Sequence, residues 1–271
     1  MLGQCAQRRP YLSLSCLITA LALTTACDNK ETAVVSAPEP ASTPVSVHSE
    51  MAPGLDSQQK ADWILDRWLA LQLAPETEEV ASRQMDGRVN LIDQALFGDI
   101  RVVQKGKDRV YRKVTFPGGR FLEEGYDAKQ GWQRVTGKKV RNLSPEELAS
   151  RRATGRLVSS DYKEKYIERR FISLGEVEGQ AAFRLELTDD VGDRRVLYLD
   201  AKTFEVFKVR SVPAGKSQAR SITLMKDYRR VDGILVPFFM HLEDDNGVQE
   251  IRVFEVKHNV DVNDKLFKRP R

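Results

Sequence analysis

Cysteine is almost absent from this 271-residue chain, because Cys5, Cys16 and Cys27 all lie within the first 27 residues. The rest of the sequence therefore offers no disulfide scaffold, no thiol nucleophile and no cysteine ligand. Histidine is also scarce, and neither His241 nor His258 has a second histidine at the spacing of a metal site. We expect no metal site and no cofactor.

The motifs of common catalytic sites are missing as well. There is no G-x-S-x-G elbow, no phosphate-binding P-loop, no H-E-x-x-H and no EF-hand calcium loop. Among the paired acids, Glu123 and Glu124 would point to opposite faces of a strand, so they cannot act on one substrate. The other pairs, Asp189-Asp190 and Asp244-Asp245, fall in predicted turns. We expect no catalytic residue and predict that the protein is not an enzyme.

A large excess of charge of one sign is absent too. Only two of the 43 basic residues, Arg8 and Arg9, precede residue 28, so the rest of the chain carries 41 bases against 39 acids. Such a balance argues against a nucleic-acid binder that works by charge. The basic pairs Arg151-Arg152, Arg194-Arg195 and Arg229-Arg230 are predicted to lie on solvated faces or at loop ends.

The first 27 residues contain no acid and resemble a secretory signal. Arg8 and Arg9 precede an apolar run of about 15 residues, shorter than the roughly 20 that a spanning helix needs. Small residues then lead to Cys27, and this arrangement resembles the lipobox of bacterial lipoproteins. The resemblance implies that Cys27 is lipidated, and three acyl chains hold a protein stably in a bilayer. Asp28 resembles the signal that retains lipoproteins in the inner membrane, facing the periplasm, which we favour over the outer membrane.

The region after Cys27 is predicted to be a flexible tether. It is rich in proline, serine, alanine and threonine, contains no aromatic residue, and has no sustained hydrophobic period. About 27 such residues span roughly 30 Å. We divide the chain into a signal peptide, 1–26, the lipidated cysteine and tether, 27–54, and one folded domain, 55–271.

The folded domain begins with a predicted helix over 55–73. Asp56 and Gln59 form a capping box, and apolar residues including Ile64 and Trp68 recur at helical spacing. Two interpretations of Trp63, Ile64 and Trp68 remain open. They pack in a core, or they belong to a helix that closes over a lipid cavity.

Most of the remaining sequence predicts antiparallel strands. Met85-Asp86-Gly87-Arg88 is predicted to be a turn, and Ser144-Pro145 starts a second helix. Tight turns such as Asp232-Gly233 separate alternating strands in the second half. We predict a mainly β (α+β) fold, in which a curved antiparallel sheet of about ten strands carries two helices on its concave side.

Turns and strand edges in this region also resemble a known family. The matching residues are Gly175, Glu178-Gly179, Phe183, Leu185, Leu187, Leu197-Tyr198-Leu199-Asp200, Thr203, Asp227-Tyr228-Arg229, Val231-Asp232-Gly233, Pro237, Val256, Asn259, Asp264, Phe267 and Pro270. Together they resemble the outer-membrane lipoprotein-sorting (LolA-like) superfamily. The resemblance implies an unclosed β-barrel with a helical lid over an apolar cavity for acyl chains. We assign no residue here to the arginine that latches the lid in that family.

A predicted strand supplies candidates for the cavity wall. Val236, Phe238 and Met240 belong to an apolar row that runs from Ile234 to Leu242. This row is a solid core packed against the helices, or it lines a cavity together with Trp63, Ile64 and Trp68. Two functions stay open: binding of lipid or lipoprotein acyl chains, or a non-catalytic interaction or sensor module that contacts a membrane protein. Fold resemblance alone does not choose between them.

Overall fold

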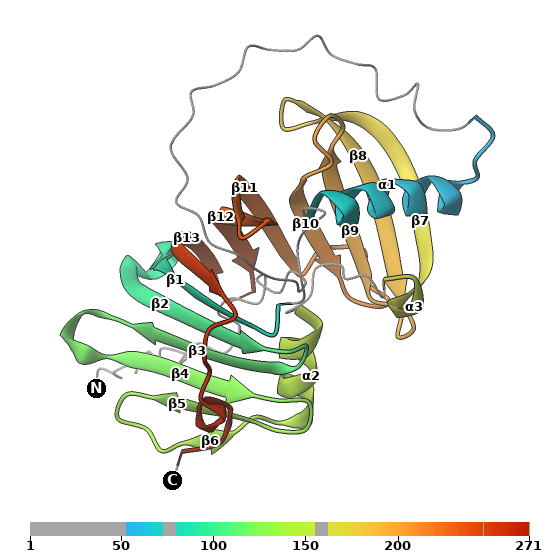
Figure 1. Ribbon diagram of the computed structural model, residues 1–271. Helices are drawn as coiled ribbons and strands as arrows, with labels where there is room; N and C mark the ends of the chain where they lie inside the picture. The colour runs from blue at the N-terminus through green and yellow to red at the C-terminus, as the bar shows by residue number, and fades with distance from the viewer. Residues whose placement is uncertain (1–52, 73–79, 155–161, 246, 271) are drawn as a thin grey trace, which may run out of the picture.

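The protein is built on one antiparallel sheet, seen in a computed structural model that describes residues 53–72, 80–154, 162–245 and 247–270 (Figure 1). Thirteen strands follow one another in the order β6-β5-β4-β3-β2-β1-β13-β12-β11-β10-β9-β8-β7. The two ends of this order are different strands, so the sheet is not closed. The prediction of a mainly β, unclosed and antiparallel fold is confirmed, with thirteen strands rather than about ten.

Three helices accompany the sheet: α1, Ser57–Gln72; α2, Pro145–Thr154; and α3, Tyr162–Lys165. The strands of the first half are β1, Ser82–Leu91; β2, Leu96–Lys105; β3, Arg109–Thr115; β4, Phe121–Tyr126; β5, Gly131–Val135; and β6, Arg141–Asn142. Those of the second half are β7, Tyr166–Val177; β8, Gln180–Asp189; β9, Arg194–Asp200; β10, Val206–Val212; β11, Ser221–Val231; β12, Ile234–Asp244; and β13, Gly247–His258. Short 3₁₀ turns lie at Ile92–Gln94, Pro117–Gly119 and Asp264–Phe267.

The two halves of the sequence meet at the centre of the sheet. There β1 pairs with β13, and from this seam each half runs outward as a meander, to β6 on one side and β7 on the other. Hydrogen bonds tie the ends of the seam, including one from the Ala81 amide to Asn259 Oδ1 at 3.0 Å.

One expectation for this region is wrong. Met85-Asp86-Gly87-Arg88 was predicted to be a turn, but it lies inside β1. The pairing of β1 with β13 shifts by one residue between Asp86 and Gly87, which marks a β-bulge. A Cβ on Gly87 would lie 2.5 Å from the Arg252 carbonyl oxygen, so glycine serves here for close approach of two strands.

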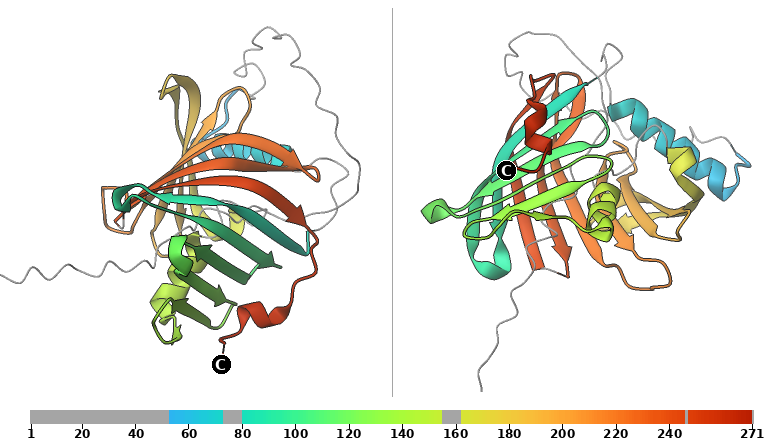
Figure 2. Two further views of the ribbon diagram at one scale, coloured as in Figure 1. Left: turned by 90° about the vertical axis from the view of Figure 1, so that its left-hand side faces the viewer. Right: turned by 90° about the horizontal axis from the view of Figure 1, so that it is seen from below.

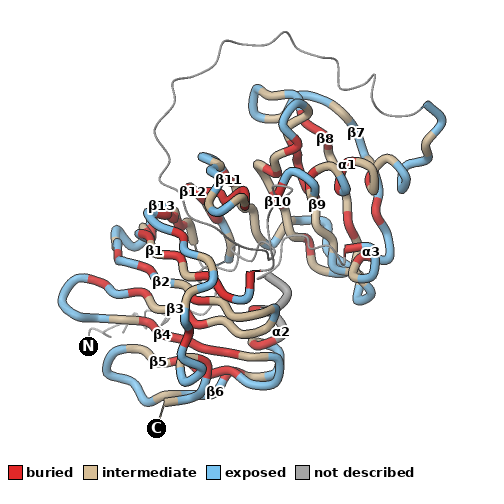
Figure 3. The backbone as a smooth tube through the Cα atoms, viewed as in Figure 1, coloured by how far each residue is buried: buried red, intermediate tan, exposed pale blue. Residues whose placement is uncertain are grey.

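The sheet has an inner and an outer face, which alternate along each strand. The inner face carries residues such as Val89, Ile100 and Met240, each at most 2% exposed. Val114 of β3 and Leu185 of β8, from opposite halves of the sheet, belong to the same apolar cluster on this face. The sheet therefore curves around that cluster, as Figures 2 and 3 show.

The helices α1 and α2 lie on the inner face, as predicted. The α1 N-terminus is a capping box, in which the Gln59 amide donates to Asp56 Oδ1 at 2.8 Å and the Asp56 amide donates to Gln59 Oε1 at 2.9 Å. The α2 N-terminus repeats this arrangement with Ser144 and Glu147. Arg141 holds the pKa of the Glu147 carboxyl down to about 2 through charge-assisted hydrogen bonds.

The segment after β13 covers part of the outer face. It passes across β3, β4 and β5, where Val262 and Phe267 pack on Tyr111 and Trp132 (Figure 1). The Trp132 indole donates to the Phe267 carbonyl oxygen at 3.2 Å. A side chain at Gly125 would collide with this segment, since its Cβ would lie 2.6 Å from the Leu266 carbonyl oxygen.

The predicted signal peptide, Cys27, Asp28 and nearly all of the tether lie outside the described residues. The proposed division of the chain at residues 26 and 54 therefore stays a prediction. Within the described residues, no helix has the length and hydrophobicity to cross a membrane.

Candidate functional site

Helix α1 places an apolar stripe against the inner face of the sheet. Ile64 is fully buried and Trp68 is 1% exposed, while Trp63 is half-buried and packs at the margin of the same cluster. The ring of Trp63 lies edge-on to Phe204, with 5.8 Å between centroids, and the Arg67 guanidinium lies 4.2 Å from the Trp63 ring. The stripe therefore combines a buried centre with an aromatic and cationic edge.

Strand β12 supplies the opposite wall. Val236, Phe238 and Met240 alternate onto the inner face and are buried, whereas Phe239 points outward beneath Arg252. Arg229 lies 4.4 Å from the Phe238 ring, so a cation also lies beside the middle of this row. The continuous apolar row predicted from Ile234 to Leu242 is present, and all five of its members belong to the main cluster.

The structure thus brings five of the six candidate cavity residues together in one apolar cluster, and the sixth, Trp63, packs against it. Four of them, Ile64, Trp68, Val236 and Met240, are at most 1% exposed. In this conformation the row is buried, with Phe238 at 6% and Leu242 at 8% exposed.

Polar contacts hold α1 to β7 and α3. Arg169 of β7 donates from Nε and Nη2 to the two carboxylate oxygens of Asp62, at 2.6 and 3.2 Å. This hydrogen bonding raises the pKa of the Arg169 guanidinium. Next to it, the Tyr162 hydroxyl donates to Asp66 Oδ1 at 2.8 Å and Lys163 Nζ lies 3.1 Å from Asp66 Oδ2. Burial, followed by the bond to Asp66, raises the pKa of Tyr162.

The C-terminal end of α1 is attached to β11 and β12. Once the Gln72 amide is oriented to satisfy both partners, its nitrogen donates to the Leu235 carbonyl at 3.2 Å and its oxygen accepts from the Trp68 indole at 2.8 Å. Arg230 donates to the Leu71 carbonyl at 2.9 Å. Helix α1 is therefore held by polar contacts at its edges and by apolar packing along its centre.

A second buried cluster, centred on Glu124, was not foreseen. Glu124 is 1% exposed and accepts from Arg112 of β3, from Arg151 of α2 at 3.1 Å and from Gln133 at 3.4 Å. Arg151 was predicted to be solvated, but it is 5% exposed and fixes α2 to the sheet. The prediction that Glu123 and Glu124 point to opposite faces is confirmed. Glu123 lies on the outer face, where its carboxylate accepts a hydrogen bond from the Tyr111 hydroxyl.

The two histidines of the domain lie apart and do not form a shared site. His241 contacts Glu243, at 3.1 Å, and Glu250. His258 contacts Asp232 at 3.0 Å, and its side chain is 2% exposed. Burial lowers the pKa of His258. No group of three or more potential metal ligands occurs within the described residues.

Comparisons with known proteins bear on the fold. No protein-family model matches the sequence, and no curated protein matches it. Among solved structures, an outer membrane lipoprotein-sorting protein domain from Vibrio parahaemolyticus is similar, with 16% identity, a TM-score of 0.53, and coverage of 78% of this chain and 97% of that one. A LolA superfamily protein from Nitrosomonas europaea has 16% identity and a TM-score of 0.51 over 77% of this chain and 97% of its own.

The fold is LolA-like. A DUF1329 family protein from Desulfovibrio piger is similar to the same extent, with 15% identity, a TM-score of 0.56, and coverage of 79% and 98% of the two chains. The LolA-like fold was the one implied by the resemblance in sequence. At these identities the likeness concerns the fold, so function has to be argued from the site.

Proposed function

We propose that this chain is a non-catalytic, membrane-anchored envelope protein that binds acyl chains of lipids or lipoproteins between α1 and the inner face of the sheet. In this proposal Cys27 is lipidated and the domain faces the periplasm, with retention in the inner membrane favoured by Asp28. A role in lipoprotein sorting or envelope maintenance would follow.

One observation carries the proposal. Ile64 and Trp68 of α1 and Val236, Phe238 and Met240 of β12 come from distant parts of the sequence, yet they belong to one apolar cluster, against which Trp63 packs. Sites for acyl chains are mostly apolar with a few polar groups at the rim. Arg67 and Arg229 contact the aromatic rings at this margin, so the margin has the polarity that the mouth of such a site requires.

The attachment of α1 supports a cover that can open. Of its edge contacts, the Lys163–Asp66 pair is more than half exposed, so water can replace it, whereas the less exposed Arg169–Asp62 pair would have to break when α1 lifts. The apolar centre would exchange one apolar contact for another when an acyl chain enters. Most of the apolar contacts that α1 loses on opening would therefore be replaced by contacts with the acyl chain.

Native mass spectrometry of the Cys27→Ser protein tests this proposal, because that variant has no anchor of its own to contribute acyl groups. Co-purified acyl species that are lost in Phe238→Glu would support binding at this site. A ligand-free protein that captures one membrane protein would instead support an interaction or sensor module. A protein with no bound ligand and a rigid apolar cluster between α1 and β12 would identify the row from Ile234 to Leu242 as solid core. That result would contradict acyl binding.

A further inference from the structure

The outer face of the sheet carries a strip of alternating basic and aromatic side chains. Lys226 of β11 pairs in register with Phe239 of β12, and Phe239 pairs with Arg252 of β13. Arg252 in turn pairs with Arg88 of β1 across the seam. We call these residues, together with two flanking phenylalanines, the outer strip: Lys226, Phe239, Arg252, Arg88, Phe97 and Phe254.

The two flanking phenylalanines are unusually exposed. Phe97 is 53% and Phe254 is 60% exposed, and they are the only aromatic side chains among the exposed large hydrophobic residues that the structure describes. Both rings lie 5.9 Å from the same guanidinium, that of Arg88. Phe254 is the extra residue of the β13 bulge. Bulges often turn a side chain toward a functional surface.

The charges of the outer strip are only partly neutralised. Across residues 53–270, apart from the gaps in the description, no ion pair involves Lys226 or Arg252. Arg88 lies 3.5 Å from Asp99, but both side chains are more than half exposed, so this pair is weak. Of the acids in the neighbouring registers, Asp86 is bound to Arg101 at 2.6 Å and Glu255 to Lys257 at 2.9 Å, while Glu250 lies 3.6 Å from His241. Of the three basic side chains of the strip, only that of Arg88 has an ion pair among the described residues.

The position of the outer strip also matters. Strands β12, β13, β1 and β2 are central in the order of the sheet, so the strip lies near the apex of its convex face. Among the described residues, the C-terminal segment packs on β3, β4 and β5 and on Val103 near the end of β2, whereas Phe97 lies near the start of that strand (Figure 1). A convex apex touches a flat surface first.

We propose that the outer strip docks the domain on an anionic phospholipid bilayer. Lysine and arginine are attracted to anionic headgroups, while exposed phenylalanines enter the boundary between headgroups and acyl chains. The predicted tether, 27–54, would span roughly 30 Å and so keep the domain within reach of the bilayer. The proposal uses the face opposite to α1 and does not depend on acyl binding.

A single fluorescent label tests the proposal. Because cysteine is absent after residue 27, Asn90→Cys in the Cys27→Ser protein prepared from residue 27 gives one labelling site. Every contact described above lies within 53–270, so this protein contains the whole fold. Asn90 is paired with Phe97 on the outer face. The control label replaces Val191, which is 69% exposed in the β8–β9 turn.

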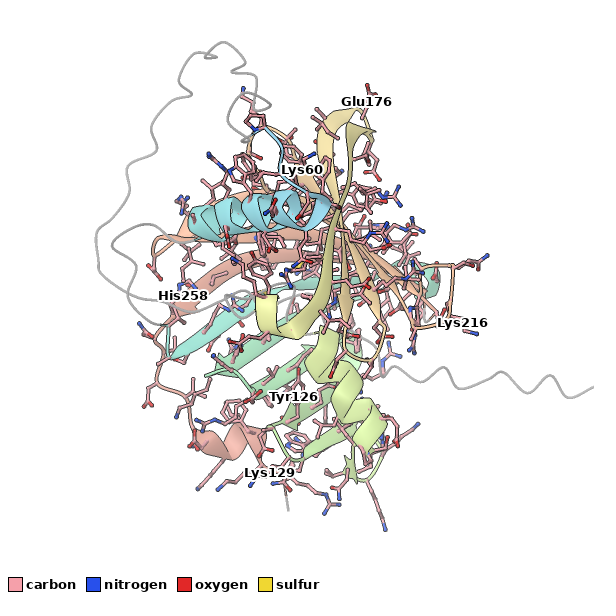
Figure 4. All side chains as sticks on the ribbon, turned by 90° about the vertical axis from the view of Figure 1, so that its right-hand side faces the viewer. Lys60, Tyr126, Lys129, Glu176, Lys216 and His258 are labelled. Atoms are coloured by element: carbon pink, nitrogen blue, oxygen red, sulfur yellow. The ribbon has the colours of Figure 1, made fainter. Side chains whose placement is uncertain are left out.

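We expect a blue shift of the label at position 90, but not at 191, when vesicles of phosphatidylcholine with phosphatidylglycerol are added, and its reversal by 1 M salt. Lys226→Glu with Arg252→Glu should weaken binding at least about tenfold. The matched charge change, Lys129→Glu with Lys216→Glu, lies in two hairpin loops and should have no such effect (Figure 4). If the first double variant fails to fold, Phe254→Ser replaces it.

Three results would overturn the proposal. An equal shift with pure phosphatidylcholine, or none at all, would exclude recognition of an anionic bilayer. A label already buried without vesicles that becomes exposed when residues 28–52 are deleted would identify the tether as the occupant. A shift that instead grows with protein concentration would identify a second copy of the chain.

Discussion

Arg169 and Asp62 join the edge strand β7 to helix α1 through a two-pronged hydrogen-bonded ion pair, with Nε to Oδ1 at 2.6 Å and Nη2 to Oδ2 at 3.2 Å. The Arg169 side chain is 9% exposed and that of Asp62 is 22% exposed, so water competes weakly for this pair. It is the best-defined polar restraint on the helix that covers the candidate site.

Asp62→Asn should loosen α1. Loss of the charge on a hydrogen-bonded partner of Arg169 is expected to cost about 1–3 kcal/mol of unfolding free energy. Denaturant unfolding measures this loss, and hydrogen exchange should show faster exchange in α1 than in β12. Asp66→Asn is the matched control, and it should cost less because the Asp66 side chain is 54% exposed. Equal effects of the two variants would contradict a special role for the Arg169–Asp62 pair.

Cys27→Ser should move the protein from the membrane to the soluble periplasmic fraction. The predicted lipid anchor would be lost, and the apolar run before Cys27 is too short to span a bilayer. Fractionation followed by a high-salt wash measures this change. Cys16→Ser, which alters a cysteine inside the apolar run, serves as control and should stay with the membrane. A Cys27→Ser protein that resists the wash would contradict lipidation at this residue.

Met240→Ala distinguishes a cavity wall from a solid core. Met240 is fully buried, so in a rigid core its truncation should cost about 2–5 kcal/mol of unfolding free energy. We expect a smaller loss together with altered lipid affinity, because acyl chains would fill the space left by the side chain. Thermal unfolding and lipid binding should be measured on the same preparation. A large loss of stability with no lipid bound to the unsubstituted protein would show a solid core.

Glu124→Gln should destabilise the half of the sheet that carries α2. The substitution leaves two buried arginines, Arg112 and Arg151, facing a neutral amide, and breaking a buried ion pair costs about 3–5 kcal/mol. Glu123→Gln is the neighbouring control on the outer face, where its partner Arg134 is 38% exposed, and it should cost less. The unfolding free energies of the two variants test this prediction. A larger loss in Glu123→Gln than in Glu124→Gln would contradict it.

His258 should make stability depend on pH. Desolvation lowers the pKa of His258 in the folded state below 6.5, although Asp232 opposes the shift. The unfolded chain then binds more protons in the interval just below pH 6.5, so the unfolding free energy falls as the pH drops through it. Melting temperatures at pH 7.5 and 5.5 measure this effect. His258→Gln should reduce the difference between the two melting temperatures. An unchanged difference would assign the pH dependence to other groups.

The elements predicted well from sequence are those with a regular local pattern. The periodic apolar residues of α1 and the alternating row of β12 identified the face that each element buries, and the capping box of Asp56 and Gln59 formed as expected. The two candidate walls of the site could therefore be named residue by residue. Their meeting in one cluster followed from the LolA-like resemblance, because no local pattern specifies which distant elements pack together.

The misses depend on contacts between distant residues. Gly87 has the same local signature in a turn as in a bulge, and only its partner Val253 on β13 distinguishes the two. The burial of Arg151 depends on Glu124, which belongs to a strand far earlier in the chain. The two-residue strand Arg141–Asn142 exists through its pairing with β5, so a count of strands based on local alternation falls short.

The seam between β1 and β13 has a consequence for how the outer strip arises. Arg88 and Phe97 belong to the first half of the chain, whereas Lys226, Phe239, Arg252 and Phe254 belong to the second. The contacts that join these halves include one between residues 178 positions apart, whose closure is among the slowest steps open to a chain of this topology. A chain in which β1 and β13 have not yet paired therefore displays no complete strip.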